Sequence, residues 1–458
     1  MKSASISRWY IFLAQWLCCA TFCPKKTVPC YRFHQLSSSI HYDYEDTVEN
    51  VPLSSLRSGS WVKFISGASN QDLPLIRNMC YLYTRAGVDC IDMSADPAVV
   101  IVATEAIQKA MNDCRISTAQ KPLIMISVND DDDPHFRKAF FDKSKCPPTC
   151  HRPCEKVCPA LAIPPLPNVA QYSTVGVERV SEIMYDKNVA SSGVIADRCY
   201  GCGRCVPICP LGLIDTESYT VSKEAITELF HTGLVDAIEI HTLQHHESSF
   251  TELWNGIGDE VLSKAKVLSV SFPNMGNSTI PYLNALQSII SSRESWNHFE
   301  GVQIWQSDGR PMSGDIGKGT ALKSSNLASY VLDELESTAA VRRLVDGSEA
   351  TVMADKGHLR DVRNGVDYID LFSGGHFVQL AGGTNDYSAE KALEEGLIGA
   401  TGFGGFAFGG YARRSIGEIL QDLEQSHPGS NVEDHPEVLQ TCLDFAKRLV
   451  NSVKKKPI

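Results

Sequence analysis

Two groups of four cysteines in the middle of the chain constrain its fold more than any other feature. The second group reads Cys199-Tyr-Gly-Cys202-Gly-Arg-Cys205-Val-Pro-Ile-Cys209-Pro. Its spacing, C-x2-C-x2-C-x3-C-P, is that of bacterial ferredoxins, in which three thiolates bind one 4Fe-4S cluster and the fourth binds the neighbouring cluster. A structural zinc site would instead need four ligands in paired C-x2-C units. The spacing therefore predicts iron–sulfur clusters.

The first group has a longer spacing than the second. It reads Cys146-Pro-Pro-Thr-Cys150-His-Arg-Pro-Cys154-Glu-Lys-Val-Cys158-Pro, which adds one residue to two of the gaps. The stretch could make its cluster labile, so that one iron is lost. If the fourth cysteine of each group binds the partner cluster, two ligand sets follow. They are Cys146, Cys150, Cys154 and Cys209 for one cluster, and Cys158, Cys199, Cys202 and Cys205 for the other.

The beginning of the chain resembles a targeting segment. Residues 1–42 contain no Asp or Glu but several Lys, Arg and Ser residues. A basic, serine-rich and acid-free start is typical of an organelle transit peptide. The apolar stretch Trp9–Phe22 could also be the core of a secretory signal. Because iron–sulfur clusters are poorly suited to an oxidising lumen, we expect import into an organelle.

Strand-like and helix-like segments alternate on both sides of the cysteine region, which predicts parallel βαβ units. About seven or eight such units predict an α/β fold, a (β/α)8-barrel-like domain with an inserted two-cluster ferredoxin-type module. The expected strands are Trp61–Ser66, Asp89–Met93, Leu123–Val128, Ala237–His241, Leu268–Phe272, Gly301–Trp305, Phe377–Ala381 and Gly404–Phe408. The expected helices are Asp72–Ala86, Pro97–Met111, Lys223–His231, Tyr282–Ser292, Ala321–Glu336 and Ser388–Glu395.

The domain boundaries follow from these patterns. We expect a transit peptide and linker at 1–50, the barrel at 51–140 and 216–425, the ferredoxin-like module at 141–215, and a helical tail at 426–458. Between the two cysteine groups lies a long insert, Leu161–Arg198. The run of four acidic residues from Asp130 to Asp133 is expected to be a solvated turn.

Charge and hydropathy argue against nucleic-acid binding and against a transmembrane helix. The formal net charge of −12 disfavours nucleic-acid binding, which requires a basic face. No uncharged apolar run reaches the roughly 18 residues that suggest a transmembrane helix.

Glycines follow the last two predicted strands and suggest a second site. Backbone amides at Gly382, Gly383, Gly409 and Gly410 could point at an anion, as in many barrels that bind phosphate after their late strands. FMN or another phosphate-bearing ligand is therefore a candidate cofactor. Alternatively, the glycines only allow tight turns with positive φ.

Charged residues near this rim have less specific interpretations. Asp308, Arg310 and Asp315 could be catalytic, but bracing of a long loop is the better-supported interpretation. Arg413 and Arg414 could neutralise a phosphate, or could simply be solvated at a helix start. His245 and His246 are expected to be loop residues rather than metal ligands.

Several segments together resemble one family, the light-dependent period proteins of cyanobacteria and their plant and algal relatives. They are Trp61–Ser69, Ala86–Pro97, the lengthened cysteine group, Asp308–Gly317, Gln379–Asp386 and Gly410–Arg413. The resemblance implies a protein with two iron–sulfur centres that senses cellular redox state and adjusts the circadian period to light. It implies no established reaction. With the leader, it implies import into the chloroplast stroma, the secretory pathway being the alternative.

Two functions are therefore expected to compete. The first is an iron–sulfur redox sensor or electron-transfer protein that acts on redox or signalling protein partners. The second is an oxidoreductase whose clusters feed a flavin or substrate at the glycine rim. Because no set of residues dictates a reaction, the sequence favours the first and leaves enzymatic activity uncertain.

Overall fold

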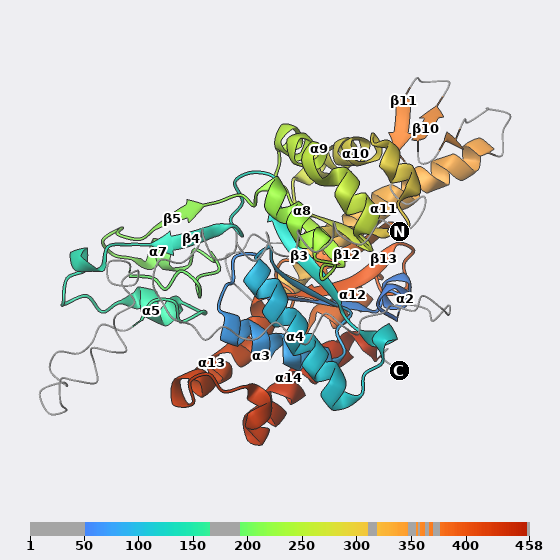
Figure 1. The fold of residues 1–458 in the computed structure, drawn as a ribbon. Helices are drawn as coiled ribbons and strands as arrows, with labels where there is room; N and C mark the ends of the chain where they lie inside the picture. Colours follow the sequence, from blue (N-terminus) through green and yellow to red (C-terminus); the bar gives the residue numbers. More distant parts are fainter. Residues whose placement is uncertain are drawn as a thin grey trace, which may run out of the picture. The chain divides into compact units, whose positions relative to one another are not determined.

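Eight parallel strands form a closed barrel. Each strand pairs with the barrel strand that comes before it and the one that comes after it in the sequence, and the last strand pairs with the first. The computed structural model describes residues 51–164, 193–309, 318–346 and 376–455, and short strands at 354–355, 358–361 and 366–369. Around the barrel (Figure 1) the strands are β1 (Trp61–Ile65), β2 (Cys90–Ser94), β3 (Leu123–Asn129), β6 (Ala237–His241), β7 (Val267–Pro273), β8 (Val302–Asp308), β12 (His376–Ala381) and β13 (Phe403–Phe408). The predicted (β/α)8 barrel is confirmed, because β13 pairs with β1 and closes the sheet.

Helices connect successive strands and cover the outside of the barrel (Figure 1). Local signals explain where they begin and end: the Asp72 side chain accepts a hydrogen bond from the backbone N–H of Leu75, and Gly87 ends the same helix with φ of 89°. The helices are α2 (Val51–Arg57), α3 (Leu73–Ala86), α4 (Pro97–Cys114), α8 (Lys223–His231), α9 (Glu247–Lys264), α10 (Thr279–Ser291), α11 (Lys318–Asp346), α12 (Ser388–Glu394), α13 (Gly410–Ser426) and α14 (Pro436–Lys454).

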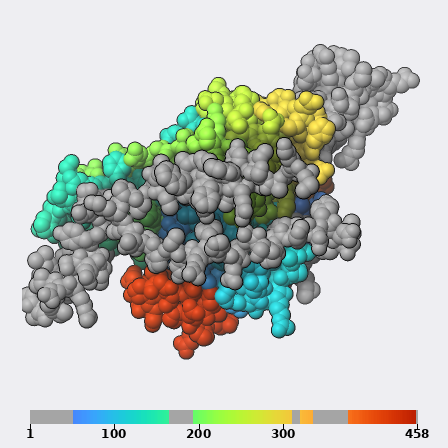
Figure 2. Space-filling view, viewed as in Figure 1, coloured from blue at the N-terminus to red at the C-terminus, as the bar shows by residue number. Residues whose placement is uncertain are grey.

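The last helix packs against the first part of the barrel. α14 contacts α3 and β1, and Lys454 Nζ lies 2.5 Å from Asp89 Oδ1. Figure 2 shows the red C-terminal residues beside the cyan residues of α4. The tail expected at 426–458 is thus a helix that belongs to the barrel's outer layer. Among the described residues, no helix is both long and apolar enough to cross a membrane.

The interior of the barrel has an apolar layer and a polar layer. Trp61, Leu123 and Ile304 belong to a buried apolar cluster. Side chains alternate along a strand, so Lys63, two residues after Trp61, also points inward and is buried. Buried polar residues occupy the same level on the other strands: Asp92, Ser127, Glu239, Ser269, Gln306 and Gln379. The polar layer lies toward the carboxyl ends of the strands, where barrel active sites occur.

The cysteine module interrupts the barrel between β3 and α8. Two antiparallel strands, β4 (Arg137–Phe140) and β5 (Asp215–Ser218), enclose the short helices α5 (Pro153–Val157) and α7 (Cys205–Ile208). The module has a small core of its own, which includes Cys154, Cys199 and Cys205. It is also joined to the barrel, because Gln421 of α13 donates a hydrogen bond to the carbonyl of Ala160 at 3.0 Å.

Candidate functional site

The fold brings thiols of the first cysteine group close to thiols of the second. Cys146 lies near Cys150 and also near Cys209 of the second group. Conversely, Cys202 and Cys205 lie near Cys199 and also near Cys158 of the first group. Cys154 is buried in the module core. The fourth cysteine of each group is therefore placed with thiols of the other group.

Backbone N–H groups point at several of these sulfurs. Ala162 N donates to Cys158 Sγ at 3.2 Å, and Leu213 N donates to Cys209 Sγ at 3.4 Å. Each donor lies four residues after the cysteine of a Cys-Pro pair, so the two halves of the module are locally alike. Ala139 N also donates to Cys199 Sγ at 3.3 Å. Hydrogen bonds to sulfur are among the features that tune iron–sulfur clusters.

Several of the thiols are held in their protonated form by burial. Burial, with the nearby thiols Cys202 and Cys158, raises the pKa of Cys205 to about 12. Burial also raises the pKa of Cys158 and Cys202. Because metal ligands must be thiolates, bound iron would supply the positive charge that these buried sulfurs lack.

Within the part of the chain that the structure describes, the thiols are more widely spaced than the ligands of one zinc ion. Four sulfurs around one zinc ion lie roughly 4 Å apart, given a Zn–S distance of about 2.3 Å. Among the described residues, however, no three cysteines have sulfurs within 4.8 Å of one another. Gly201 and Gly203, with φ of 73° and 71°, shape the loop between the thiols. The residues present therefore fit an iron–sulfur cluster, whose larger core holds its thiolates farther apart.

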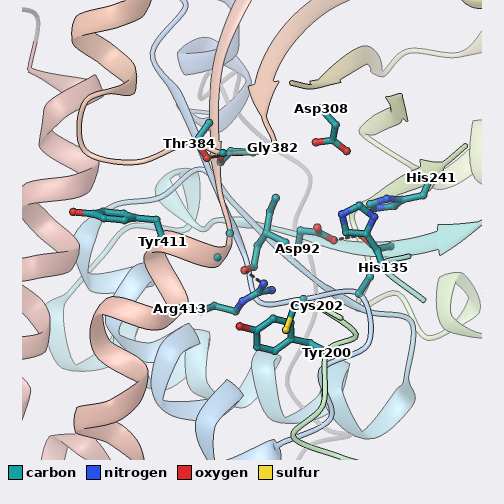
Figure 3. Close-up of a pocket in the computed structure, with 18 of the residues that line it drawn as sticks. Asp92, His135, Tyr200, Cys202, His241, Asp308, Gly382, Thr384, Tyr411 and Arg413 are labelled. Atoms are coloured by element: carbon teal, nitrogen blue, oxygen red, sulfur yellow. Dashed lines mark hydrogen bonds between the residues drawn. The ribbon is translucent and has the colours of Figure 1, made fainter. Parts of the chain in front are cut away.

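The cavity at the carboxyl ends of the strands lies directly against the cysteine module. It has about 1020 Å³ of empty space, including the part open to solvent. Its module side is formed by Pro159, Tyr200, Cys202 and Arg204, and its barrel side includes the glycine rim. Figure 3 shows Cys202 and Tyr200 on the side of the cavity near Arg413. A cysteine of the predicted second cluster thus shares a cavity with the predicted anion site.

A hydrogen-bonded network of buried side chains forms the floor of the cavity. Glu239 pairs with Lys63 and accepts hydrogen bonds from Ser269 Oγ at 2.9 Å and Gln306 Nε2 at 2.7 Å. Burial alone would raise the pKa of Glu239, but the charges of Lys63 and His241 lower it below the usual range. Burial, together with the charge of Glu239, raises the pKa of Asp92 to about 6. Glu239 is therefore the ionised centre of the network, and Asp92 is the carboxyl group that protonates more readily.

The glycine rim combines two kinds of glycine. Gly382 and Gly383 have φ of 64° and 98°, so the turn itself requires glycine there. A Cβ on Gly383 would also lie 3.0 Å from the Cβ of Thr320. Gly410 begins α13, and a Cβ built on it would meet no heavy atom within 4 Å. Gly410 consequently faces open space in the cavity rather than a packed neighbour.

Arg413 lies on the same side of the cavity as Gly410. Its side chain is 9% exposed, and its guanidinium carbon lies 4.2 Å from the centre of the Tyr200 ring. Nη1 reaches the carbonyl oxygen of Ile65 at 3.5 Å, while the buried Nε has no hydrogen-bond partner among the described residues. A buried guanidinium with an unused donor is suited to an anion.

On the opposite wall lie two histidines and an acidic residue. Nδ1 of His135 is 2.7 Å from Asp133 Oδ1, and the rings of His135 and His241 are 4.8 Å apart. Burial alone would lower the pKa of His241, but its hydrogen bond to Glu239 and the charge of Asp133 raise that pKa to about 9. The expectation of a solvated acidic turn is wrong for Asp133, which is 2% exposed because His135 holds it.

The other predicted residues have different outcomes. Asp308 lines the cavity and accepts a hydrogen bond from Ser271 Oγ at 2.6 Å. Arg310 and Asp315 lie outside the described residues. Nδ1 of His246 lies 2.9 Å from Asp130 Oδ1, which accepts its hydrogen bond. The sequence interpretation missed the charged inward residues of β1, β2 and β6, which are Lys63, Asp92, Glu239 and His241. The available signal was a charged residue at an inward position of a buried strand.

An α/β barrel with cysteines of a ferredoxin-type module at its mouth defines an iron–sulfur-binding barrel protein. A family model described as the LdpA Fe-S cluster-binding domain matches residues 146–220. A second, described as the Light dependent period A C-terminal domain, matches residues 229–352 and 365–452. The chain is 37% identical over 410 residues to "Light dependent period A" of Synechococcus elongatus, covering 89% of this chain and 94% of that protein. The chain belongs to the light dependent period A family.

The comparison with solved structures gives a weak match. It is the carboxyl transferase domain of Rhizobium etli pyruvate carboxylase with pyruvate and biocytin. The match has 7% identity and a TM-score of 0.30, and covers 88% of this chain and 49% of that chain. The closed pairing of the eight strands defines the barrel independently of this match.

Proposed function

We propose that this chain is an iron–sulfur redox sensor that binds two 4Fe-4S clusters, one of them against the barrel cavity. The single observation that carries the proposal is that Cys202, placed with Cys158, Cys199 and Cys205, lines the same cavity as Arg413. When bound, the clusters supply reversible one-electron transfer. The eight motif cysteines are their proposed ligands.

Arg413 would couple the redox state to the cavity. Its guanidinium lies over the ring of Tyr200, two residues from Cys202. Each added electron makes its surroundings more negative, so Arg413 would hold an anion in the cavity less tightly. By thermodynamic linkage, a bound anion would lower the reduction potential by the same free energy. A bound ligand and a cluster could thus report on each other.

A phosphate-bearing ligand such as FMN is the second candidate, and it would make the protein an oxidoreductase. The specific observation is that Nε of Arg413, beside the start of the 17-residue helix α13, has no hydrogen-bond partner within the described part of the chain. The N-cap Gly409 provides no side-chain cap, so the first amides of the helix are available for an anion.

Gly410→Ala tests the anion site without disturbing the turn. Alanine has a higher helix propensity than glycine, and its Cβ would enter open space. Thermal stability should therefore hold or rise, while binding of FMN or inorganic phosphate weakens at least about tenfold in calorimetric titration, a loss of about 1.4 kcal/mol. Gly383→Ala is less informative, since its strain costs stability with or without a ligand.

Gly417→Ala provides the matched control in the same helix. Its Cβ would make only an ordinary contact, 3.8 Å from Met79 Cε, and it lies outside the cavity lining. It should leave binding unchanged. If wild type binds neither FMN nor phosphate at millimolar concentration, the anion site is refuted and the barrel serves as a scaffold for the clusters.

We also propose that the protein acts in the chloroplast stroma and passes light or redox information to protein partners. The acid-free, basic leader supports the location, and the relative's name, "Light dependent period A", supports the link to light. Residues 1–50 lie outside the described residues.

A fusion of residues 1–59 to a fluorescent protein should accumulate in plastids, because a basic and hydroxyl-rich leader is read as a transit peptide. Fluorescence microscopy in plant or algal cells provides the measurement. A fusion that begins at Val51 should stay in the cytosol. Accumulation of the full leader fusion in the secretory pathway would refute the proposed location.

A further inference from the structure

Three metal-ligating side chains converge on one wall of the barrel cavity. Asp133 and His135 come from the segment after β3, and His241 ends β6. One ligand atom from each lies within 4.8 Å of the other two. Within the described ranges, this is the one group of three or more His, Cys, Asp or Glu residues that meets this distance. Figure 3 shows the rings of His135 and His241 side by side.

The distances suit one first-row metal ion after a small adjustment. Two neighbouring ligands of such an ion lie about 3 Å apart, given metal–ligand distances of about 2.0 to 2.2 Å. Nδ1 of His135 and Oδ1 of Asp133 are already 2.7 Å apart. The ligand atom of His241 would have to move inward by about 1 to 2 Å to bind the same ion.

The electrostatics of this wall also favour a cation. Asp133 and Glu239 are buried there. Asp308 is close enough for its carboxylate to interact with the charges of both histidines. Lys63 is the permanently charged cation that pairs with Glu239. Buried carboxylates are costly unless paired or bound to metal. Without a metal, Lys63 and protonated His241 balance part of this charge, and a divalent ion would balance it in place of the histidine proton.

We infer that Asp133, His135 and His241 bind a divalent first-row metal ion such as Mn²⁺ or Zn²⁺ at the cavity wall. Two imidazoles and a carboxylate are a common ligand set for such ions. The site is separate from the cysteine module and does not depend on the proposed redox function. Because its ligands line or adjoin the cavity, the ion would be able to accept an oxygen ligand from a bound molecule.

The competing arrangement is a purely hydrogen-bonded one. In it, both histidines carry protons and pair with Asp133 and Glu239, as His241 does with Glu239 at 3.2 Å. Both arrangements give the same side chains a partner, which is a metal ion in one and a hydrogen bond in the other. They differ in whether a metal ion displaces the protons.

Manganese binding to the cluster-loaded, oxidised protein distinguishes them. 4Fe-4S clusters in the 2+ state are diamagnetic, and the six-line hyperfine pattern of the paramagnetic resonance signal distinguishes Mn²⁺ from any oxidised 3Fe-4S cluster. We expect one Mn²⁺ per chain, displaced by Zn²⁺, with an unchanged iron content. His135→Gln and His241→Gln should each weaken binding by at least about tenfold, the lower end of the effect of disturbing a metal site.

His246→Gln is the matched control, because Nδ1 of His246 lies 2.9 Å from Asp130 Oδ1 in a histidine–carboxylate pair outside the group. It should leave Mn²⁺ binding intact. Should the buried His241→Gln fail to fold, hyperfine coupling of Mn²⁺ to imidazole nitrogen in wild type decides the matter. The inference is overturned if wild type binds no Mn²⁺ at millimolar concentration, if binding survives the His135 substitution, or if no nitrogen coupling is found.

Discussion

Cys158→Ser should remove the same iron–sulfur cluster as Cys199→Ser, although the two cysteines belong to different motifs. The structure places Cys158 with Cys199, Cys202 and Cys205. Loss of either thiol takes one of four ligands from one cluster, so the iron content should fall from about eight to about four per chain. Cys146→Ser should remove the other cluster. Iron analysis and the spectrum of the reduced protein after anaerobic reconstitution provide the measurement.

The test compares the iron–sulfur spectra that remain in the three variants. Cys158→Ser and Cys199→Ser should leave one and the same spectrum, different from that left by Cys146→Ser. Cys114→Ser is the control, since Cys114 is an exposed cysteine outside the module, and it should keep full iron content. If Cys158→Ser instead matches Cys146→Ser, each motif binds its own cluster and the cross-ligated arrangement is wrong.

Lys63→Met should destabilise the barrel by about 3 to 5 kcal/mol, the usual cost of removing one partner from a buried ion pair. Both Lys63 and Glu239 have 0% exposed side chains. Methionine keeps much of the volume of lysine, so the loss comes from the charge and not from a cavity. The apparent melting temperature of the cluster-loaded protein, followed by far-ultraviolet circular dichroism, should fall by several degrees.

The double variant Lys63→Met/Glu239→Gln should recover part of that loss, because it no longer leaves a buried carboxylate without its cation. Lys109→Met is the exposed control. Lys109 pairs with Asp113 at 2.6 Å on the surface of α4, and such pairs contribute at most about 0.5 kcal/mol. A Lys63 variant as stable as the Lys109 variant would show that the buried pair does not stabilise the barrel.

The sequence predicted the barrel because its strands and helices carry strong local patterns. The helix Lys223–His231 and the strand Ala237–His241 occur as expected, since the Ser222 side chain caps the helix and all five strand residues are buried. The helix α9 was missed. Its polar residues at Ser248, Ser249 and Asn255 obscure an apolar face that includes Phe250 and Trp254.

The chemistry of the cavity was harder to predict than the cysteine motifs. Cysteine spacing is a local property of the chain, whereas the floor of the cavity depends on which strand residues point inward and on register between distant strands. Glu239 and Lys63, separated by 176 positions, meet only after the barrel closes. Likewise, Asp133 ends an acidic run that looks solvated until His135 and His241 are placed beside it.

Iron and sulfide analysis of the anaerobically reconstituted wild type, combined with paramagnetic resonance after reduction, tests the central claim most directly. The account predicts about eight irons and eight sulfides per chain, with two reduced 4Fe-4S signals broadened by their mutual interaction. About four irons, or zinc in place of iron in the module, would contradict it.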